Sequence, residues 1–240
     1  MQRRKFMATG GALVAGAAFG PARAFSLSND EAVMPSKLCS ATTRITRGPY
    51  LTPNSPLRSD IREDRAGVPL RLTLKIQNDF WCQPIEGAAV DIWHCDASGL
   101  YSNVNNVQFD YQTLQLSGSA IDMRGTSFLR GHQVTNAAGV VEFLTVFPGW
   151  YMGRLPHLHV KTTINGVEWT THDTQLFLPT DIERAVYETP PYAERGQNPL
   201  SADRDLVAKG DASLVQAMTV PLTRDGDGYK GVFEIAMAAL

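Results

Sequence analysis

The chain has 240 residues, 43% of them hydrophobic and 19% charged, a composition typical of a globular protein with a sizeable core. Its formal net charge of −2 at pH 7 provides no basic surface for nucleic acid. All-β domains of about 200–250 residues are common, so a single domain is the simplest interpretation of this length.

The first 24 residues have the pattern of a cleavable export signal. Arg3-Arg4-Lys5 precedes an uncharged run rich in Ala and Gly, and Ala22-Arg23-Ala24 provides a small-x-small cleavage site. The apolar run is too short and too rich in glycine to span a bilayer, so we expect no membrane anchor. The arginine pair favours the twin-arginine route. We therefore expect a periplasmic or extracellular protein whose mature chain carries 18 basic against 24 acidic residues.

Residues 25–47 are rich in Ser, Thr and Asn and predict a flexible arm before a domain over residues 48–240. Apolar and polar residues then alternate from Leu70 to Ile76, the period of two that marks a half-buried strand. Similar signals predict further strands over residues 88–95, 140–147, 158–164, 167–171, 218–222 and 232–237.

Turn signals separate these predicted strands. Asn165-Gly166 is a strong hairpin signal, and residues 225–228 are expected to form a second hairpin. Residues 181–200 are interpreted as a long surface loop, and residues 201–208 as a short helix with Ser201 as its cap. Many short strands with frequent turns predict an all-β fold, an antiparallel β-sandwich with long loops.

Candidate ligands are most concentrated just before and within the strand predicted near residue 158. His157 and His159 are two residues apart, so both imidazoles project from one face while Leu158 and Val160 face the core. Two adjacent imidazoles can form half of a metal site. For this pattern alone, two surface histidines remain the simpler interpretation.

Tyr151 changes this balance. It lies just before the histidine pair, after a Pro-Gly turn that can fold it back toward them. A phenol keeps its proton near neutral pH, which makes it a poor ligand for soft or borderline metals. A hard trivalent metal can displace that proton and retain the phenolate, so the combination points to iron(III).

A second dense segment, Trp93 to Ser102, ends a predicted strand and enters a loop, where site residues concentrate. Together with other motifs it resembles the intradiol ring-cleavage dioxygenases, the group that includes catechol and protocatechuate dioxygenases. The matching motifs follow one another in family order within residues 45–180: Gly48-Pro49-Tyr50, residues 57–61, residues 93–102, residues 130–135, Pro148-Gly149-Trp150-Tyr151 and the His157/His159 pair.

The resemblance implies that Tyr101, Tyr151, His157 and His159 bind iron(III) together with a hydroxide. Tyr101 matches the tyrosine of the family's G-x-Y-S segment, and Tyr151 matches the tyrosine that substrate displaces from the metal. It also implies that Arg154 stabilises negative charge on the bound ring and that Gln175 supports the same site. Without the resemblance, an exposed ion pair for Arg154 and a surface position for Gln175 would be favoured.

The chain departs from the family pattern in three places. Asn136 stands where an acidic residue is usual, and residues 178–181 read Leu-Pro-Thr-Asp in place of Phe-Pro-Gly-Asp. Residues 25–69 are too short and irregular for the helical dimerisation segment of the catechol dioxygenases. The similarity is therefore to a single-domain, exported branch.

The remaining histidines and the cysteines are not predicted ligands. His94 is expected to be packed and hydrogen-bonded, His132 to lie in a turn, and His172 to lie close enough to Gln175 for a small chance of substrate contact. Two of the three cysteines, Cys39, Cys82 and Cys95, can pair in an oxidising compartment, and their spacing does not indicate which two. Without a C-x-x-C spacing they do not favour zinc.

The resemblance implies an oxidoreductase that cleaves the ring of a catechol-type small molecule between its two hydroxylated carbons and incorporates both atoms of O2. Two alternatives remain. One is an exported β-sandwich that binds a carbohydrate or protein ligand and keeps a relic metal site, because fold does not imply function. The other is a hydrolytic site with copper or zinc at the same four residues.

Overall fold

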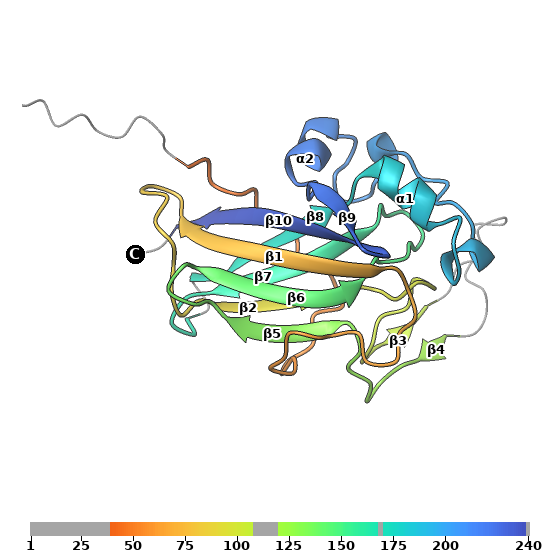
Figure 1. Ribbon diagram of the computed structural model, residues 1–240, viewed down its shortest axis with the longest axis horizontal. Helices are drawn as coiled ribbons and strands as arrows, with labels where there is room; N and C mark the ends of the chain where they lie inside the picture. The colour runs from red at the N-terminus through yellow and green to blue at the C-terminus, as the bar shows by residue number, and fades with distance from the viewer. Residues whose placement is uncertain (1–38, 108–119, 168–169, 239–240) are drawn as a thin grey trace, which may run out of the picture. The chain divides into compact units, whose positions relative to one another are not determined.

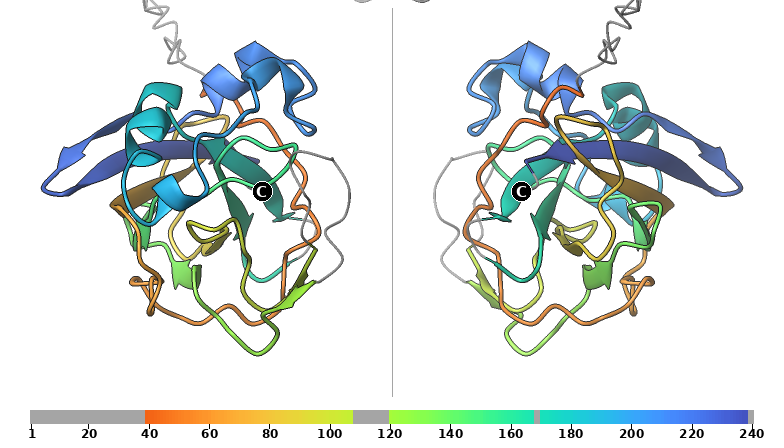
Figure 2. Two further views of the ribbon diagram at one scale, coloured as in Figure 1. Left: turned by 90° about the vertical axis from the view of Figure 1, so that its right-hand side faces the viewer. Right: turned by 90° about the vertical axis from the view of Figure 1, so that its left-hand side faces the viewer.

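The protein is described by a computed structural model that covers residues 39–107, 120–167 and 170–238. The predicted export signal and residues 25–38 of the predicted arm lie outside the described residues. Two four-stranded sheets form the layers of a β-sandwich (Figures 1 and 2), so the predicted all-β class is confirmed. Among the described residues, no helix has the length and apolar character needed to cross a bilayer.

The first sheet has the order β6-β1-β10-β9 and the second has the order β5-β2-β7-β8. The bounds of the first sheet are β6 (Val140–Val146), β1 (Pro69–Asn78), β10 (Gly228–Met237) and β9 (Leu222–Asp225). Those of the second are β5 (Arg130–Val134), β2 (Ala89–Trp93), β7 (His157–Thr163) and β8 (His172–Phe177). The remaining elements are the short pair β3 (Asn105–Asn106) and β4 (Ile121–Asp122), the helices α1 (Thr180–Val186) and α2 (Ala212–Ala217), and the 3-10 turns η2 (Tyr192–Glu194) and η3 (Ala202–Arg204).

The alternation that predicted β1 places its apolar side chains in the core. Leu70, Leu72, Leu74 and Ile76 are fully buried and belong to the cluster that fills the space between the sheets. β1 pairs antiparallel with β6 and parallel with β10, so the sheet is mixed and differs here from the expected antiparallel arrangement. The alternation of residues encodes which face is buried, but it does not encode the direction of a neighbouring strand.

β7 is central in the second sheet and is buried on both of its faces. Leu158 and Val160 belong to the core cluster, as their alternation predicted. On the opposite face His157 and His159 are also buried, and Lys161 is the one partly exposed residue of the strand. Such a pattern requires that other parts of the chain cover the outer face of this sheet.

Residues 39–50, which we call the strap, provide part of this cover. The Ile45 amide donates to the Asp173 carbonyl of β8 at 3.0 Å, and the Thr174 hydroxyl donates to the Thr43 carbonyl at 2.7 Å. The described part of the arm that we expected to be flexible, residues 39–47, is therefore bound to the sandwich. Backbone hydrogen bonds to a strand edge have no local sequence signature, which is why its composition resembled that of a loose segment.

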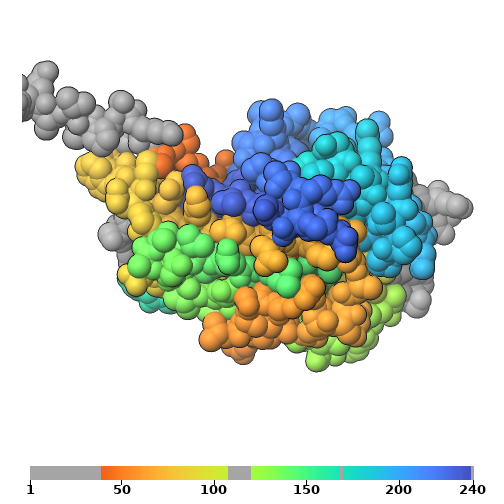
Figure 3. Space-filling model, in the orientation of Figure 1, coloured from red at the N-terminus to blue at the C-terminus, as the bar shows by residue number. Residues whose placement is uncertain are grey.

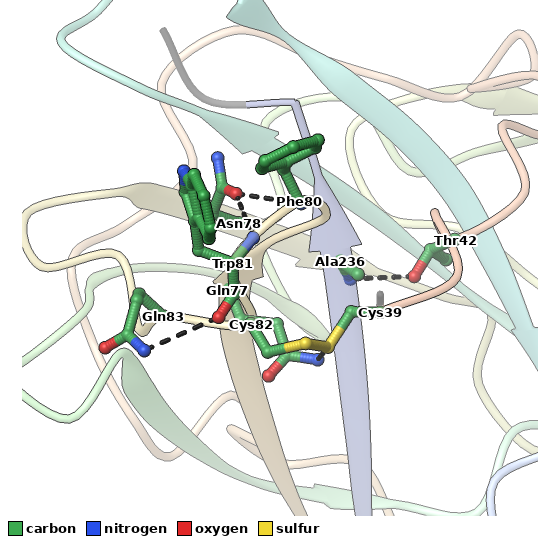
Figure 4. The surroundings of a disulfide bond; sticks show 9 residues. All are labelled: Cys39, Thr42, Gln77, Asn78, Phe80, Trp81, Cys82, Gln83 and Ala236. Carbon is green, nitrogen blue, oxygen red and sulfur yellow. Dashed lines mark hydrogen bonds between the residues drawn. A yellow bond between two sulfur atoms is a disulfide. The ribbon is translucent and has the colours of Figure 1, made fainter. Parts of the chain in front are cut away.

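A disulfide joins the start of the strap to the turn after β1 (Figure 4). Cys39 pairs with Cys82 across 43 residues of sequence, and Cys95 is free and buried. Beside this disulfide, the Ala236 amide of β10 donates to the Thr42 hydroxyl at 2.8 Å. The strap is thus attached to both sheets.

Several predicted bounds differ from the structure. The hairpins at Asn165-Gly166 and at residues 225–228 are confirmed in position. Residues 168–169 of the strand expected over 167–171 lie outside the described residues, and β8 begins at His172. The predicted loop 181–200 contains α1 and η2, and the predicted helix 201–208 is reduced to η3. β5 was not predicted because it contains Gly131, where a side chain would approach the Ile61 methyl within 2.4 Å. At that position close packing overrides β propensity.

Candidate active site

The four predicted metal ligands lie together at the start of β7. The Nε2 atoms of His157 and His159 are 3.2 Å apart, and the Tyr151 hydroxyl lies 3.1 Å from His157 Nε2. The Tyr101 ring stands edge-on to the Tyr151 ring, with 5.7 Å between their centroids. The centroids of the Tyr101 and His159 rings are 6.1 Å apart. The site is therefore assembled from one strand, the turn before it and the loop after β2.

A glycine allows the two tyrosine segments to approach each other. A Cβ on Gly149 would lie 2.5 Å from the carbonyl oxygens of both Asp96 and Ala97, in the loop that leads to Tyr101. The Gly149 amide also donates to the Asp96 carbonyl at 3.1 Å. Any side chain at this position would push the Tyr151 turn away from that loop, so the glycine is needed for this close approach.

Two tyrosines of the segment after β8 donate hydrogen bonds to backbone carbonyls of the same turn. The Tyr192 hydroxyl donates to the Phe147 carbonyl at 2.6 Å, and the Tyr187 hydroxyl donates to the Pro148 carbonyl at 3.1 Å. Both rings are buried in the main core. The long segment that follows β8 therefore fixes the backbone on which Tyr151 is carried.

Hydrogen bonding sets the tautomer of His157. Its Nδ1 lies 2.6 Å from the Leu155 carbonyl, which can only accept, so Nδ1 carries the proton and donates it. The lone pair of Nε2 consequently points into the cluster of ligands. A metal-bound histidine typically donates its other ring nitrogen to a carbonyl or carboxylate in this way.

His159 is positioned by packing rather than by a hydrogen bond. Its ring stacks on Trp93 with 4.9 Å between centroids and an angle of 1° between the planes. Gly48 of the strap closes the other side, where a Cβ would lie 3.1 Å from His159 Cε1. Among the described residues, Nδ1 of His159 has no hydrogen-bond partner. Two contacting surfaces therefore fix the ring plane and direct Nε2 toward His157.

Tyr101 is the more deeply buried of the two tyrosines. Its side chain is 1% exposed, its ring stacks on Tyr50 with 4.3 Å between centroids, and its hydroxyl has no hydrogen-bond partner within the described part of the chain. A buried hydroxyl without a partner is costly, so such a group calls for a functional explanation. Tyr151 is partly exposed, which places it nearer to an entering molecule.

Burial sets the protonation states in this cluster. It raises the pKa of Tyr101 well above its ordinary value, and it raises the pKa of Tyr151 as well. It also lowers the pKa of His157 and His159 well below the usual range, and the nearby Arg154 charge acts in the same direction on both. The imidazoles are therefore neutral, as metal ligands must be, and the phenols would ionise only beside a compensating cation.

The donor chemistry fits a highly charged, hard metal ion. Across residues 39–107, 120–167 and 170–238 there is no group of three or more His, Cys, Asp and Glu side chains placed to hold a metal. The candidate site depends on its two phenol oxygens, and phenolate oxygen favours hard cations. The unpaired hydroxyl of Tyr101 and the inward lone pair of His157 are positioned to bind such an ion.

Arg154 and Gln175, the two other predicted site residues, contact each other beside this cluster. Arg154 Nη1 lies 3.3 Å from His157 Nε2, and Arg154 Nη2 donates to the Gln175 side-chain oxygen. The Gln175 amide in turn donates to the Thr46 carbonyl of the strap at 2.6 Å. Both side chains are buried, so neither is the surface group that its position alone favoured.

One residue of this network was not predicted. Asp205, which follows η3, accepts a hydrogen bond from Arg154 Nε at 3.0 Å and is itself fully buried. It lies within the short helix predicted over residues 201–208. No local pattern distinguishes it from the exposed Asp203, and its role is visible only in the fold.

The remaining histidines lie outside the cluster. His94 is buried and hydrogen-bonded to the Cys95 carbonyl and the Thr145 hydroxyl, as predicted. His132 lies within β5, not in the expected turn, and its Nδ1 is 3.1 Å from an Asp91 carboxylate oxygen. His172 pairs with Thr162, whereas His157 pairs with Phe177 at the other end of β8, so the expected proximity of His172 to the site is not found.

Comparisons with solved structures give a consistent family. An intradiol ring-cleavage dioxygenase from Tetranychus urticae is 30% identical, with a TM-score of 0.71 over 83% of this chain and 95% of that chain. The dioxygenase domain of a dioxygenase carbohydrate-binding protein fusion from Streptomyces sp. SirexAA-E is 25% identical, with a TM-score of 0.56 over 84% of this chain and 100% of that chain.

A hydroxyquinol 1,2-dioxygenase from Pseudomonas putida DLL-E4 has the same fold at 19% identity, with a TM-score of 0.56 over 85% of this chain and 69% of that chain. No family model matches the chain, and a search of curated proteins finds no match. The relationship is therefore carried by the three-dimensional structure together with the identity of 30%.

Proposed function

The chain belongs to the intradiol ring-cleavage dioxygenases, and we propose that it binds iron(III) and cleaves catechol-type rings between the two hydroxylated carbons. The observation that carries this proposal is the convergence of two phenols and two neutral imidazoles in one buried cluster. A protein that only binds a carbohydrate or a partner has no need for four such donors. This convergence supports the enzyme over the binding protein with a relic site.

In this proposal Tyr101, Tyr151, His157 and His159 hold the metal. Bound there, iron(III) would supply Lewis acidity toward the two oxygens of a catechol. Tyr151 is the partly exposed ligand, so we assign to its oxygen the role of accepting a substrate proton when the substrate replaces it. Tyr101 is fully buried between Tyr50 and the histidines and is assigned a permanent role.

Arg154 is assigned the stabilisation of negative charge on the ring. Its guanidinium cannot ligate a metal, because all of its nitrogens are donors. It reaches within 3.3 Å of His157 Nε2, so it lies beside any molecule bound at the cluster. Loss of such an electrostatic group typically costs about 10²–10³ in rate.

The export assignment is part of the same proposal. A mature chain beginning near Phe25 is expected from the basic start, the apolar run and the Ala22-Arg23-Ala24 site. The Cys39–Cys82 disulfide supports an oxidising compartment, where such bonds persist. Intact-mass measurement of protein from the periplasm or medium tests it, and a full-length chain confined to the cytoplasm contradicts it.

The iron assignment is tested by colour, metal content and oxygen uptake together. Purified protein should contain iron and absorb visible light, since a ferric phenolate is coloured whereas a zinc site is not. Tyr101→Phe removes an anionic ligand and should shift or abolish the band. Oxygen uptake is measured with catechol, protocatechuate and hydroxyquinol. Iron-loaded protein that consumes no oxygen with any catechol would favour the relic site, and colourless protein containing zinc would favour the hydrolytic alternative.

A further inference from the structure

Arg154 contacts three side chains, and its most completely buried partner, Asp205, is not one of the proposed metal ligands. Its Nε atom donates to Asp205 Oδ2 at 3.0 Å, Nη2 contacts Gln175, and Nη1 faces His157. The side chain of Asp205 is 0% exposed and that of Arg154 is 8% exposed. Both charges are thus removed from water, where a hydrogen bond between charged groups is short, directional and strong.

The Asp205 carboxylate is itself held rigidly. Its Oδ2 also accepts from the Leu155 amide at 2.8 Å, and its Oδ1 accepts from the Val207 and Ala208 amides at 2.9 and 2.8 Å. Four donors therefore fix one carboxylate, two of them on consecutive residues of the segment between the ligands Tyr151 and His157. A carboxylate so constrained can determine both the rotamer and the position of the guanidinium.

The geometry points to Asp205 as a positioning residue: it orients the Arg154 guanidinium so that Nη1 faces the metal cluster, and it offsets the Arg154 charge while the site is empty of substrate. The inference rests on the proposed role of Arg154. The described hydrogen bonds of the Asp205 carboxylate go to Arg154 and to three backbone amides, and none goes to the side chain of a proposed ligand, so we assign its action to Arg154. With Nε directed to Asp205 and Nη2 to Gln175, Nη1 is the nitrogen left to meet the substrate.

Two classes of measurement test this inference, the first being turnover. Asp205→Asn keeps the shape and removes the charge, and it should lower kcat by about 10-fold or more while iron content stays full, as is typical for residues that support a site indirectly. Asp203→Asn is the matched control, because Asp203 lies two residues away and is exposed. In an Arg154→Ala background, Asp205→Asn should change kcat no further, since the group through which it acts is absent.

The second measurement does not depend on turnover. In protein loaded with diamagnetic Ga(III) in place of iron, the Arg154 Nε–H should give a slowly exchanging NMR signal, because its proton is buried against Asp205. Arg154→Lys removes the signal and thereby assigns it. Asp205→Asn should shift it and speed its exchange, and Asp203→Asn should leave it unchanged. This test applies to wild-type protein even if an Asp205 variant fails to fold.

The outcomes separate this inference from the function on which it rests. If Arg154→Ala keeps full turnover, the proposed role of Arg154 is wrong. If Arg154→Ala is slow and Asp205→Asn is as fast as wild type, only the role of Asp205 is wrong. Loss of iron in Asp205→Asn, additive losses in the double variant, or a rapidly exchanging Nε–H in wild type would each overturn the positioning role.

Discussion

The two sheets of the sandwich differ in what covers their outer faces. In β1 the buried leucines alternate with Arg71 and Lys75, which are exposed, and Figure 3 views the molecule from the side of this sheet. In β7 the residues that face away from the core, His157 and His159, are as buried as those that face it. The outer face of one sheet is therefore exposed to solvent, whereas the outer face of the other is buried beneath other parts of the chain.

The difference shows how a site is made from an ordinary strand. Covering a strand's outer face with the strap and the loops removes water from the polar groups on that face. Those groups must then pair with one another or remain unsatisfied, as Nδ1 of His159 does among the described residues. The cover thus turns two histidines of a common pattern into neutral imidazoles with fixed ring planes, which is the state that a metal ligand requires.

The largest effect is expected from the covered face. His159→Ala removes one of the two imidazoles proposed to bind iron, so the protein should lose its iron and its oxygen uptake. Elemental analysis and oxygen consumption measure both. The matched control is Thr73→Ala on the uncovered face of β1, which should change the unfolding free energy by less than about 0.5 kcal/mol and leave turnover unchanged. Full iron content in His159→Ala would contradict the ligand assignment.

A substitution in the core face of the uncovered sheet should lower the unfolding free energy and leave kcat unchanged. Leu72 is fully buried between the sheets, so Leu72→Ala should lower the unfolding free energy by about 2–5 kcal/mol through lost burial and a cavity. Denaturant titration measures this loss. The kcat of the protein that remains folded should equal that of wild type, and a specific fall in kcat would show that the two sheets are coupled.

The strap can be loosened without touching either sheet. Cys39→Ser opens the disulfide and should cost about 2–4 kcal/mol of unfolding free energy, since the closed loop restricts the unfolded chain. Hydrogen exchange at the Ile45 amide should also rise, because this amide pairs with β8. Cys82→Ser and the double variant should match Cys39→Ser, and any larger loss in the double variant would mean that each cysteine has a separate role.

The smallest effect, and one that depends on pH, concerns the contact between the sheets at His94. Its Nε2 atom lies 2.7 Å from the Thr145 hydroxyl of β6, and burial lowers its pKa to about 4 from an ordinary 6.5. Between these values the unfolded chain binds a proton that the folded chain does not, so stability falls as the pH falls. From about pH 7 to pH 4.5 the loss from this group is about 2–3 kcal/mol.

Urea unfolding of metal-free protein at the two pH values tests this expectation. His94→Asn should show a smaller loss of unfolding free energy on acidification than wild type, by about the same 2–3 kcal/mol. The buried His157 and His159 are present in both proteins, and the His94 charge is the smallest of the influences on their pKa, so the difference comes chiefly from His94 itself. An identical loss in both proteins would mean that His94 is not buried in its neutral form.

The sequence alone was most informative where the structural signal is local. The period of two in residues 70–76 and 158–164 predicted two strands and their buried faces, because neighbouring residues on a strand point to opposite sides. The Asn165-Gly166 hairpin was predicted because these two residue types tolerate the positive φ angles of a tight turn. Both residues have positive φ in the structure. The H-x-H pair, read on such a strand, correctly placed two imidazoles on one face.

What escaped prediction depends on contacts between distant residues. The strap looked flexible because its pairing with β8 and its disulfide involve partners far along the chain. In the sequence Asp205 resembles any acidic residue of a short helix, and only the fold shows that it accepts a hydrogen bond from Arg154. Tyr101, Arg154 and Gln175 were identified by resemblance to a family, and for Arg154 and Gln175 their own neighbourhoods favoured surface roles.

The parallel pairing of β1 with β10 has a consequence for how the chain assembles. β1 is the first and β10 the last of the described strands, and β10 lies between β1 and β9. The first sheet is therefore incomplete until the last strand is available, and pairing between such distant segments is slow to form. Until then one edge of β1 presents unpaired backbone groups, the kind of edge on which chains aggregate. Loss of residues 228–237 should thus cause aggregation even though every proposed metal ligand is still present.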